Sequence, residues 1–267
     1  MKVILTGKNS YIANNTCSFI NSKGIEAECL SIRGGIEGVD FKGVNAVVHC
    51  AAVVHKKEAQ YADEYDRVNY ELTKEIAHKA KSQGVKHFVF MSTMAVYGVT
   101  EGIIYRDTPL EPKTLYGKSK LKAEKYILSL SDENFKVTVI RPPMVYGKNC
   151  PGNYQRLSKI AKKIPLIPDT GNRKSFIYIE NLAWFICDII EKEKEGIFMP
   201  MDKNYISTAY MMNLISGKKC SKKLGAIVRL IPLNVVKKAF GSLWYGYDIG
   251  TRVGYIPVSK AVRLSEE

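Results

Sequence analysis

Short apolar runs alternate with helical patterns along the first part of the chain. Residues 2–6 form a β-rich apolar run that ends at Gly7, and the residues from Tyr11 to Ile20 then place apolar side chains at helical spacing. Further strand patterns cover residues 25–32, 45–50 and 87–91, and helical patterns cover about 66–82 and the residues that follow 115. This alternation predicts an α/β fold with a Rossmann-type doubly wound parallel sheet.

The turn after the first strand carries the first candidate chemistry. Strand, glycine turn and helix in this order open a dinucleotide-binding unit, in which a pyrophosphate meets the helix N-terminus. The turn supplies five candidate cofactor-binding residues, namely Gly7, Asn9, Ser10, Tyr11 and Ile12. Ser10 adds a side chain where the backbone would approach the phosphates, so an ordinary strand-to-helix turn is the alternative.

The ends of the next two strands also bear on the cofactor. In NAD enzymes a carboxylate near the end of the second strand binds the ribose diol, whereas an arginine accommodates the extra phosphate of NADP. Here the strand is followed by Arg33 and no acidic residue, which slightly favours NADP. The alternative is that Arg33 is only solvated. The third strand ends in His49-Cys50-Ala51-Ala52, where the small Ala51 and Ala52 leave room for a dinucleotide and His49 reads as structural. Asn69, near the start of the following helix, is a further candidate for contact with the cofactor.

A tyrosine and a lysine four residues apart open the helical pattern after residue 115. This spacing puts Tyr116 and Lys120 on one helical face, with Cβ atoms about 5–6 Å apart. A phenol titrates near a pKa of about 10, but an adjacent ammonium and a bound nicotinamide cation would stabilise the phenolate. Tyr116 could then exchange a proton with a substrate hydroxyl, although the same spacing also arises by chance on solvated faces.

Composition narrows the class of partner. The formal charge of +14 and the pI near 9.4 come from lysines spread in ones and twos, without a nucleic-acid-binding motif, so we expect anionic small molecules as partners and no nucleic acid. The six cysteines form no Cys-x-x-Cys pair and read as buried thiols in a reducing compartment, with no metal site. No apolar run has the length of a signal peptide or a transmembrane segment, so we expect a cytoplasmic protein.

The pattern changes after Gly147. We expect a dinucleotide-binding domain over residues 1–150, with its sheet completed by about 174–200, and a mostly substrate-binding lobe over 151–267. Residues 222–245 are basic and apolar together, and we expect them to pack the small lobe or a dimer face. A peripheral membrane contact is left open for this segment, because polysaccharide sugars can be lipid-linked.

Five motifs occur in order along the chain: Thr6-Gly7-Lys8-Asn9-Ser10-Tyr11-Ile12, His49-Cys50-Ala51-Ala52, Met91-Ser92-Thr93-Met94-Ala95-Val96-Tyr97-Gly98, Tyr116-Gly117-Lys118-Ser119-Lys120 and Arg141-Pro142-Pro143-Met144-Val145-Tyr146-Gly147. Together they resemble the NAD-dependent epimerase/dehydratase family, the extended short-chain dehydrogenases that act on nucleotide sugars. The match is nearest to the epimerases of bacterial capsule and surface-polysaccharide synthesis.

The resemblance implies roles for particular residues. Thr93 takes the position of the family's catalytic serine or threonine, and Tyr116 and Lys120 match its tyrosine and lysine. Pro142 and Pro143 fall where a loop of the family contacts the nicotinamide side of the cofactor.

The resemblance also implies a substrate site in the second part of the chain. Asn153 lies in the region that clasps the nucleotide-sugar in the family. Lys174, with Arg173 beside it, aligns with the family's arginine that meets the nucleotide diphosphate; a solvated basic loop is the less favoured alternative.

These roles imply a nucleotide-sugar 4-epimerase that uses NAD, with NADP left open, and a UDP-sugar as its substrate. Transient hydride transfer at the sugar C4 would pass through a 4-keto intermediate. An NADPH-dependent 4-keto reductase would use the same three residues, and a non-catalytic dinucleotide-binding regulator is the third reading. A 4,6-dehydratase is disfavoured, because Met94 and Ala95 stand where that subgroup has Asp and Glu. Family members commonly pair, so we expect a homodimer.

Overall fold

The chain divides into two compact units in a computed structural model that describes residues 1–54 and 62–266. The first unit comprises residues 1–98, 109–142 and 182–199, and the second comprises residues 99–108, 143–181 and those from 200 onward. The sequence places a boundary near residue 150, whereas the chain leaves the first unit at Pro142 and returns to it at Leu182. The return supplies a helix and a strand to the first unit.

A parallel sheet forms the centre of the first unit. Its strands are β1 (Lys2–Thr6), β2 (Glu26–Leu30), β3 (Ala46–His49), β4 (His87–Met91), β6 (Lys136–Ile140) and β10 (Gly196–Asp202). The order is β10-β6-β4-β3-β1-β2, with β13 (Gly250–Val253) next to β10, and the pairs between neighbours from β10 to β2 are parallel. The expected doubly wound parallel sheet is therefore confirmed.

The strand order places a ligand crevice near β1 and β3. The chain moves from β1 outward to the edge strand β2 and then crosses back to β3 on the other side of β1. In open α/β sheets the carboxyl ends of the strands at such a reversal bind ligands. Gly7 follows β1 and Cys50-Ala51-Ala52 follows β3, so both predicted motifs lie at this point.

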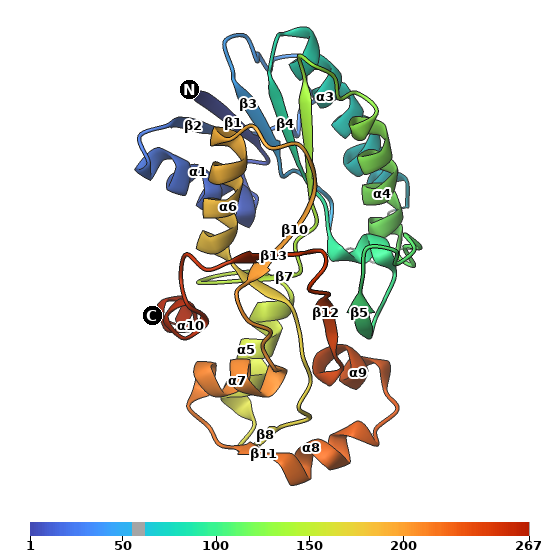
Figure 1. Cartoon of the computed structure of the whole chain (residues 1–267), viewed down its shortest axis with the longest axis vertical. Helices are drawn as coiled ribbons and strands as arrows, with labels where there is room; N and C mark the ends of the chain where they lie inside the picture. Colours follow the sequence, from blue (N-terminus) through green and yellow to red (C-terminus); the bar gives the residue numbers. More distant parts are fainter. Residues whose placement is uncertain (55–61, 267) are drawn as a thin grey trace. The chain divides into compact units, whose positions relative to one another are not determined.

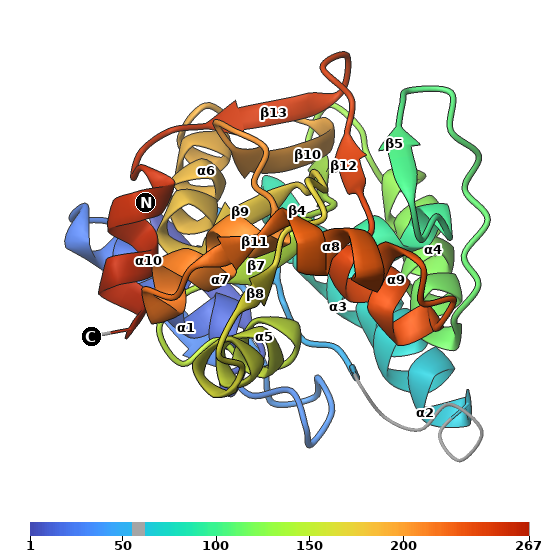
Figure 2. The ribbon, with the colours of Figure 1, turned by 90° about the horizontal axis from the view of Figure 1, so that it is seen from below.

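Helices cover both faces of the sheet (Figures 1 and 2). The helices α1 (Tyr11–Ser22) and α6 (Ile179–Glu191) lie on one face, and α3 (Leu72–Ser82) and α4 (Leu115–Leu128) lie on the other. Ahead of α3 the chain forms α2 (Ala62–Asp66) and a π-helical turn, η2 (Arg67–Glu71). The core on the α3–α4 side buries Ile76 and Ile127 against Phe88 and Phe90 of β4, as the helical spacing predicted.

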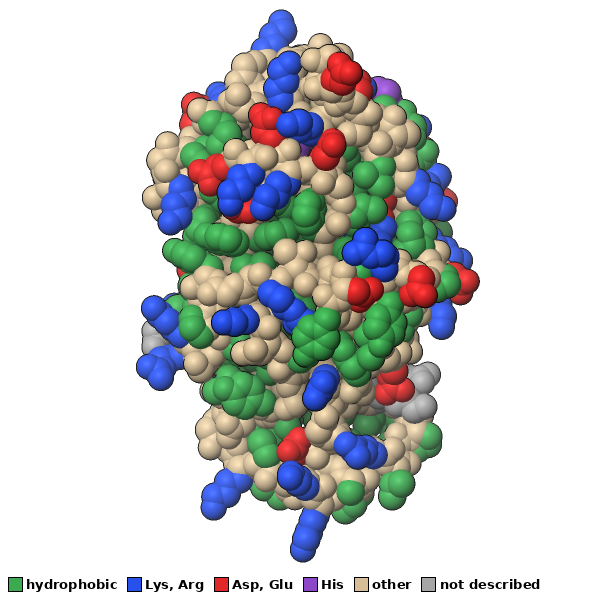
Figure 3. All heavy atoms as spheres, in the orientation of Figure 1, with side chains coloured by type: hydrophobic (Ala, Val, Ile, Leu, Met, Phe, Trp, Pro, Cys, Tyr) green, Lys and Arg blue, Asp and Glu red, His purple; other side chains and the backbone are tan. Residues whose placement is uncertain are grey.

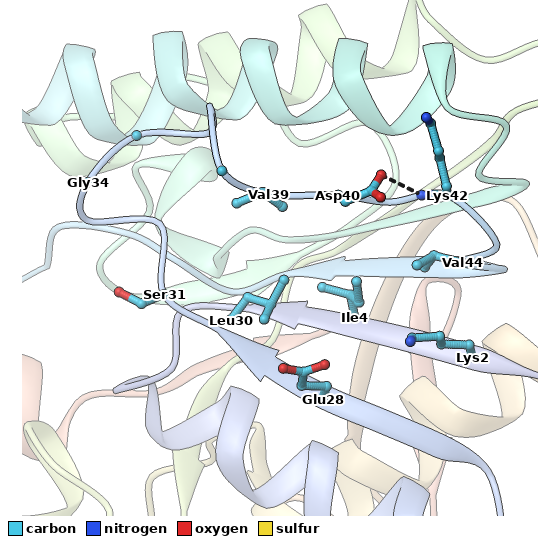
Figure 4. A pocket seen from close by; sticks show the side chains of 12 residues that line it. Lys2, Ile4, Glu28, Leu30, Ser31, Gly34, Val39, Asp40, Lys42 and Val44 are labelled. Atoms are coloured by element: carbon cyan, nitrogen blue, oxygen red, sulfur yellow. Dashed lines mark hydrogen bonds between the residues drawn. The ribbon is translucent and has the colours of Figure 1, made fainter.

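One part of the sheet has a loop in place of a helix. Residues 31–45 cross over β1 and β2 and leave a hollow of about 580 Å³, which Figure 4 shows from close by. Ile4 and Leu30 form its apolar floor, and Val39 and Val44 of the loop face them. The hollow extends along the strands as far as Lys2 and does not include the candidate catalytic residues.

Apart from β13 and the end of β10, the strands described in the second unit are short and paired two at a time. β5 (Gly102–Ile104) pairs with β12 (Leu243–Tyr245), β7 (Met144–Tyr146) with β9 (Phe176–Tyr178), and β8 (Ile167–Pro168) with β11 (Cys220–Ser221). Its helices are α5 (Asn153–Lys163), α7 (Thr208–Ser216), α8 (Lys222–Arg229), α9 (Asn234–Phe240) and α10 (Val258–Glu266). The sequence assigned about 174–200 to completion of the main sheet, but β9 pairs with β7 and β10 alone joins the sheet from this interval.

The cysteines differ in burial. All six are free thiols; Cys50, Cys150 and Cys187 are buried, whereas Cys17 and Cys29 are half-buried. Cys220 is exposed, so the expectation of buried thiols is wrong there. It lies in a two-residue strand at the edge of a two-stranded sheet, where little covers its side chain.

Candidate active site

The backbone turn after β1 requires glycine. Gly7 has φ +94, and a Cβ at this position would lie 3.1 Å from the backbone of Ala51. The amides of Gly7 and Lys8 both donate to the Leu30 carbonyl, at 2.9 and 3.1 Å, which fixes the turn against the end of β2. The chain is thus held close to the loop after β3, as a dinucleotide turn requires.

Ser10 stands where the family that the sequence resembles has a glycine, and its side chain caps the helix that follows. Its amide donates to the Gly7 carbonyl at 2.6 Å, and its Oγ accepts a hydrogen bond from the Ala13 amide at 3.4 Å. Ser10 is therefore the N-cap of α1, and no acidic residue occupies the first turn of this helix. The positive end of the α1 dipole remains suited to a phosphate, so the turn fits a dinucleotide despite the substitution.

The other predicted cofactor residues are found around this turn. Asn9 and Arg33 are exposed, and Tyr11 and Ile12 are half-buried at the start of α1. Ala51 and Ala52 are half-buried after β3. Two more follow β6, where the Pro142 carbonyl accepts a hydrogen bond from the Met94 amide at 3.2 Å and Pro143 begins the second unit. Contact of these residues with the cofactor stays a prediction.

Thr93 and Tyr116 come together at the carboxyl end of β4. Thr93 has extended backbone (φ −161, ψ 150) and caps the short helix η3 (Met94–Tyr97), with its Oγ1 accepting from the Ala95 amide at 3.1 Å. Tyr116 lies in the first turn of α4, whose N-cap is Thr114. A side-chain hydrogen bond joins Thr93 and Tyr116, so two hydroxyls predicted to act on one substrate oxygen are neighbours.

Burial controls the ionisation of Tyr116. It raises the pKa of the phenol to about 12, although the hydrogen bond with Thr93 acts in the opposite direction. The ring of Tyr65 lies 6.5 Å from the Tyr116 ring between centroids and adds to the rise. A proton acceptor at this position therefore needs positive charge nearby to reach the phenolate near neutral pH.

Lys120 is a buried amine one helical turn after Tyr116. Only 1% of its surface is exposed, and burial lowers its pKa to about 7, with Cys50 and Glu124 acting in the opposite direction. Its Nζ lies 4.0 Å from the centroid of the Phe90 ring. Keeping an ammonium among apolar groups is unfavourable, which is typical of a side chain retained for function rather than for stability.

Asn69 holds the loop after β3 to the catalytic helix. Its Oδ1 accepts from the Val53 amide at 2.7 Å, and its Nδ2 donates to the Val53 carbonyl and to Ser119 Oγ, both at 3.1 Å. Ser119 in turn donates to the Tyr116 carbonyl at 2.9 Å. Asn69 lies in the π-helical turn η2, which directs its side chain between these partners. Its predicted role in cofactor contact is not tested, but these bonds give it a structural one.

His49 is structural, as the sequence indicated. Its Nδ1 lies 2.6 Å from Thr6 Oγ1 and its Nε2 lies 3.0 Å from Thr73 Oγ1. The ring, which belongs to β3, therefore links β1 to α3. The ring stacks with Phe88 and Phe90 and is fully buried. Burial lowers the pKa of His49 to about 3, which keeps the imidazole neutral at neutral pH.

A buried ion pair braces the catalytic helix; the sequence indicates a structural role for Glu124, one turn past Lys120, but its partner Arg141 was missed. Arg141 Nη2 donates to Glu124 Oε2 at 2.6 Å and its Nη1 donates to the Tyr97 hydroxyl at 2.9 Å. Ser92 Oγ also donates to Glu124. These bonds tie α4 to the ends of β4 and β6 on either side of Thr93. A charged glutamate one turn past Lys120, followed by an arginine at a strand end, was the sequence signal for it.

The second unit contains the three residues predicted to bind substrate. Asn153 is exposed at the start of α5, and Arg173 is exposed. Lys174 is half-buried, its Nζ donates to the Lys238 carbonyl at 2.6 Å, and burial lowers its pKa to about 8. A hollow of about 370 Å³ is lined by Asn172, which precedes Arg173 in the chain, and by residues that include Arg229, Phe240 and Trp244.

These features define a Rossmann-fold protein with a threonine, a tyrosine and a lysine at the strand ends near a dinucleotide turn. The model of the NAD-dependent epimerase/dehydratase family matches residues 3–198, so the chain belongs to this family. Its turn at Gly7, the α1 N-terminus with no acidic residue in its first turn, and the small Ala51 and Ala52 fit the cofactor named in the family's description.

Individual relatives agree with this assignment. The UDP-glucose 4-epimerase of Vibrio cholerae is 32% identical over 225 residues, which is 78% of this chain and 68% of that protein. The N-acetyl-alpha-D-glucosaminyl-diphospho-ditrans,octacis-undecaprenol 4-epimerase of Escherichia coli O157:H7 is 32% identical over 149 residues, 54% of this chain but only 45% of that protein. The structure of UDP-glucuronic acid 4-epimerase from Bacillus cereus with NAD has a TM-score of 0.73 at 17% identity, covering 100% of this chain and 97% of that one, which shows a shared fold.

Proposed function

We propose that this protein is a nucleotide-sugar 4-epimerase of polysaccharide biosynthesis, with a UDP-sugar as its substrate. The observation that carries the proposal is the pairing of Thr93 with Tyr116, one turn before the buried Lys120, at the strand ends of a unit with a dinucleotide turn. The 4-epimerase relatives from Vibrio cholerae and Escherichia coli add support.

Tyr116 is the proton acceptor of the proposed reaction. As a phenolate it takes the proton from the O4 hydroxyl of the sugar, and Thr93 donates a hydrogen bond to the same oxygen while it becomes a carbonyl. A bound dinucleotide would supply the acceptor, and later the donor, for the hydride of C4. After the 4-keto sugar turns over, Tyr116 gives the proton back to O4 on the other face.

Lys120 makes Tyr116 acidic enough for this step. Burial raises the pKa of the Tyr116 phenol to about 12 and lowers the pKa of the Lys120 amine to about 7. Burial therefore disfavours both the phenolate and the ammonium. A protonated Lys120 that binds the ribose hydroxyls places a positive charge one turn from the phenolate, which lowers the pKa of Tyr116. Cofactor binding and activation of Tyr116 are thereby linked through one side chain.

Substrate binding is proposed for the second unit. Lys174 and Arg173 supply positive charge for a diphosphate, and Asn153 supplies an amide. Lys174 binds the Lys238 carbonyl in this structure and would exchange that partner for a phosphate oxygen. A lysine there interacts with phosphate as a point charge and lacks the bidentate geometry of arginine.

An NADPH-dependent 4-keto reductase is the second candidate, because the exposed Arg33 follows β2 where NAD enzymes place an acid. The two candidates differ in how they use the dinucleotide. An epimerase should purify with a bound dinucleotide, identified by mass spectrometry, and should convert UDP-glucose to its 4-epimer with none added. Stoichiometric oxidation of NADPH with a UDP-4-keto sugar, and no epimerisation, would replace the proposal with the reductase.

A further inference from the structure

Residues 218–238 of the second unit, named here the basic tip, have an unusual composition. They include seven lysine and arginine residues and no aspartate or glutamate. The segment contains α8 and the first part of α9. In Figure 1, α8 lies at the lower edge of the second unit.

The inward face of α8 is fixed by close packing. Gly225 lies against the backbone of Asp169, and a Cβ there would come within 1.9 Å of the Asp169 carbonyl oxygen. Ser221 caps the helix by accepting from the Leu224 amide at 3.2 Å, and Arg229 donates to the Thr170 carbonyl. With this face buried, the residues on the opposite face of α8 must point outward.

The outward face is apolar as well as basic. Ile227, Leu230 and Leu233 are 59%, 82% and 58% exposed, at three-residue intervals. Lysines surround them, of which Lys219, Lys222, Lys223 and Lys238 are exposed. In the lower part of the face drawn in Figure 3, lysine and arginine side chains (blue) stand next to apolar ones (green). Single exposed leucines are common, but three within seven residues, ringed by lysines, form a patch.

We propose that the basic tip docks onto an anionic phospholipid surface. The aliphatic side chains of Ile227 and Leu230 enter the headgroup boundary, and Lys222 and Lys223 pair with lipid phosphates while their methylene stems stay with the apolar side chains. Docking would bring the second unit to the membrane surface. The proposal does not depend on the epimerase activity, because binding is measured without a sugar.

Charge and side-chain type disfavour other occupants. A second copy of the chain bound through the same face would bring two sets of lysines together without any acid in either segment. Single-stranded nucleic acid is bound through stacking on aromatic rings, whereas the exposed apolar residues Ile227, Leu230 and Leu233 of the basic tip are aliphatic.

Vesicle sedimentation tests the proposal with the full chain. The protein should sediment with vesicles of phosphatidylcholine and phosphatidylglycerol, remain in solution with phosphatidylcholine alone, and dissociate as salt is raised. The Lys222→Glu/Lys223→Glu double variant should bind at least about tenfold more weakly, because each cation near an anionic surface contributes about a factor of five. The Ile227→Ser/Leu230→Ser variant should also bind more weakly.

A matched control separates a specific tip from general basicity. The Lys203→Glu/Lys260→Glu variant makes the same charge change at exposed positions elsewhere in the second unit and should bind almost as well as wild type. Circular dichroism checks that each variant is folded. Failure of wild type to bind anionic vesicles at low salt, equal losses in the tip and control variants, or a concentration-dependent dimer that Leu230→Ser abolishes would each overturn the proposal.

Discussion

The two units hold their charged side chains in different ways. In the first unit Lys120, Glu124 and Arg141 are at least 95% buried, and the last two form a hydrogen-bonded pair between α4 and the end of β6. In the second unit Arg173 and most lysines of the basic tip are exposed, and Lys174 is bound to a backbone carbonyl. The buried charged side chains of the first unit are held in fixed positions, which suits catalysis. The exposed ones of the second unit are accessible to ligands that carry negative charge.

The difference follows from the sheets. Parallel strands buried on both faces bring the residues after β1, β3, β4 and β6 to one edge, so their geometry depends little on neighbouring loops. In the second unit the described strands other than β13 and the end of β10 pair two at a time, and loops set the positions of most side chains. Substitutions in the two units should therefore change different kinetic parameters.

Replacing Tyr116 with Phe should have the largest effect. The variant keeps the ring but lacks the group that takes the O4 proton, so kcat should fall by about 10²–10⁴. Tyr126→Phe makes the same change on the same helix, where the hydroxyl binds His78, and should leave kcat nearly unchanged. Comparable turnover by the two variants would remove Tyr116 from the mechanism.

Replacing Lys120 with Met should lower activity and raise stability together. Activity should fall by about 10², because the positive charge beside Tyr116 is lost. The wild-type amine has a pKa of about 7 folded against 10.5 as the ordinary value, so the unfolded chain binds the extra proton between these pH values. Wild-type stability should therefore rise from pH 7 toward 10.

The Met variant lacks this titration. Its free energy of unfolding at pH 7 should exceed that of wild type by on the order of 4 kcal/mol, and the gap should close as the pH rises. Denaturant unfolding at several pH values measures both quantities. A gap that is constant with pH would show that Lys120 keeps an ordinary pKa in the fold.

Replacing Gly7 with Ala should weaken dinucleotide binding by about tenfold or more, because the added methyl group meets the Ala51 backbone at 3.1 Å. Gly24→Ala is the matched control. Gly24 also has positive φ, at +77, but a Cβ there meets nothing within 4 Å. Fluorescence titration with NADH compares the two; equal affinities would mean that the turn tolerates a side chain and does not approach the cofactor.

Replacing Lys174 with Met should have the smallest effect, a rise in KM of about fivefold with kcat unchanged, because uniform binding of the diphosphate is lost. Lys203→Met, at an exposed position of the same unit, should not change KM. If Lys174 acts only through its hydrogen bond to the Lys238 carbonyl, its replacement should lower the melting temperature and leave KM unchanged.

The sequence predicted the positions of residues that lie at the end of a strand or the start of a helix. Gly7, Thr93 and Tyr116 could be placed because a glycine turn, a strand end and a helix start are each local patterns. Tyr65, by contrast, reaches the Tyr116 ring from another helix, and Asn69 is aimed by a π-helical turn that no local pattern predicts. These contacts depend on how distant segments pack.

The second unit shows the same limit more strongly. The basic residues of α5 suit an exposed helix, and the resemblance to the family implies the final helix α10. The outward direction of α8 could not, because it depends on the close approach of Gly225 to Asp169, far away in the sequence. The expected packing of residues 222–245 against the lobe holds for the inward face of this helix and for β12, which pairs with β5 and buries Tyr245. It fails for the outward face of α8.

The most direct test of the epimerase account is the fate of the hydrogen on C4. UDP-glucose with deuterium at C4 should give a 4-epimer that keeps the deuterium at C4 in ordinary water, measured by NMR and mass spectrometry, because the hydride leaves and returns within one bound complex. A product with hydrogen at C4, or deuterium that accumulates in released dinucleotide, would contradict the account.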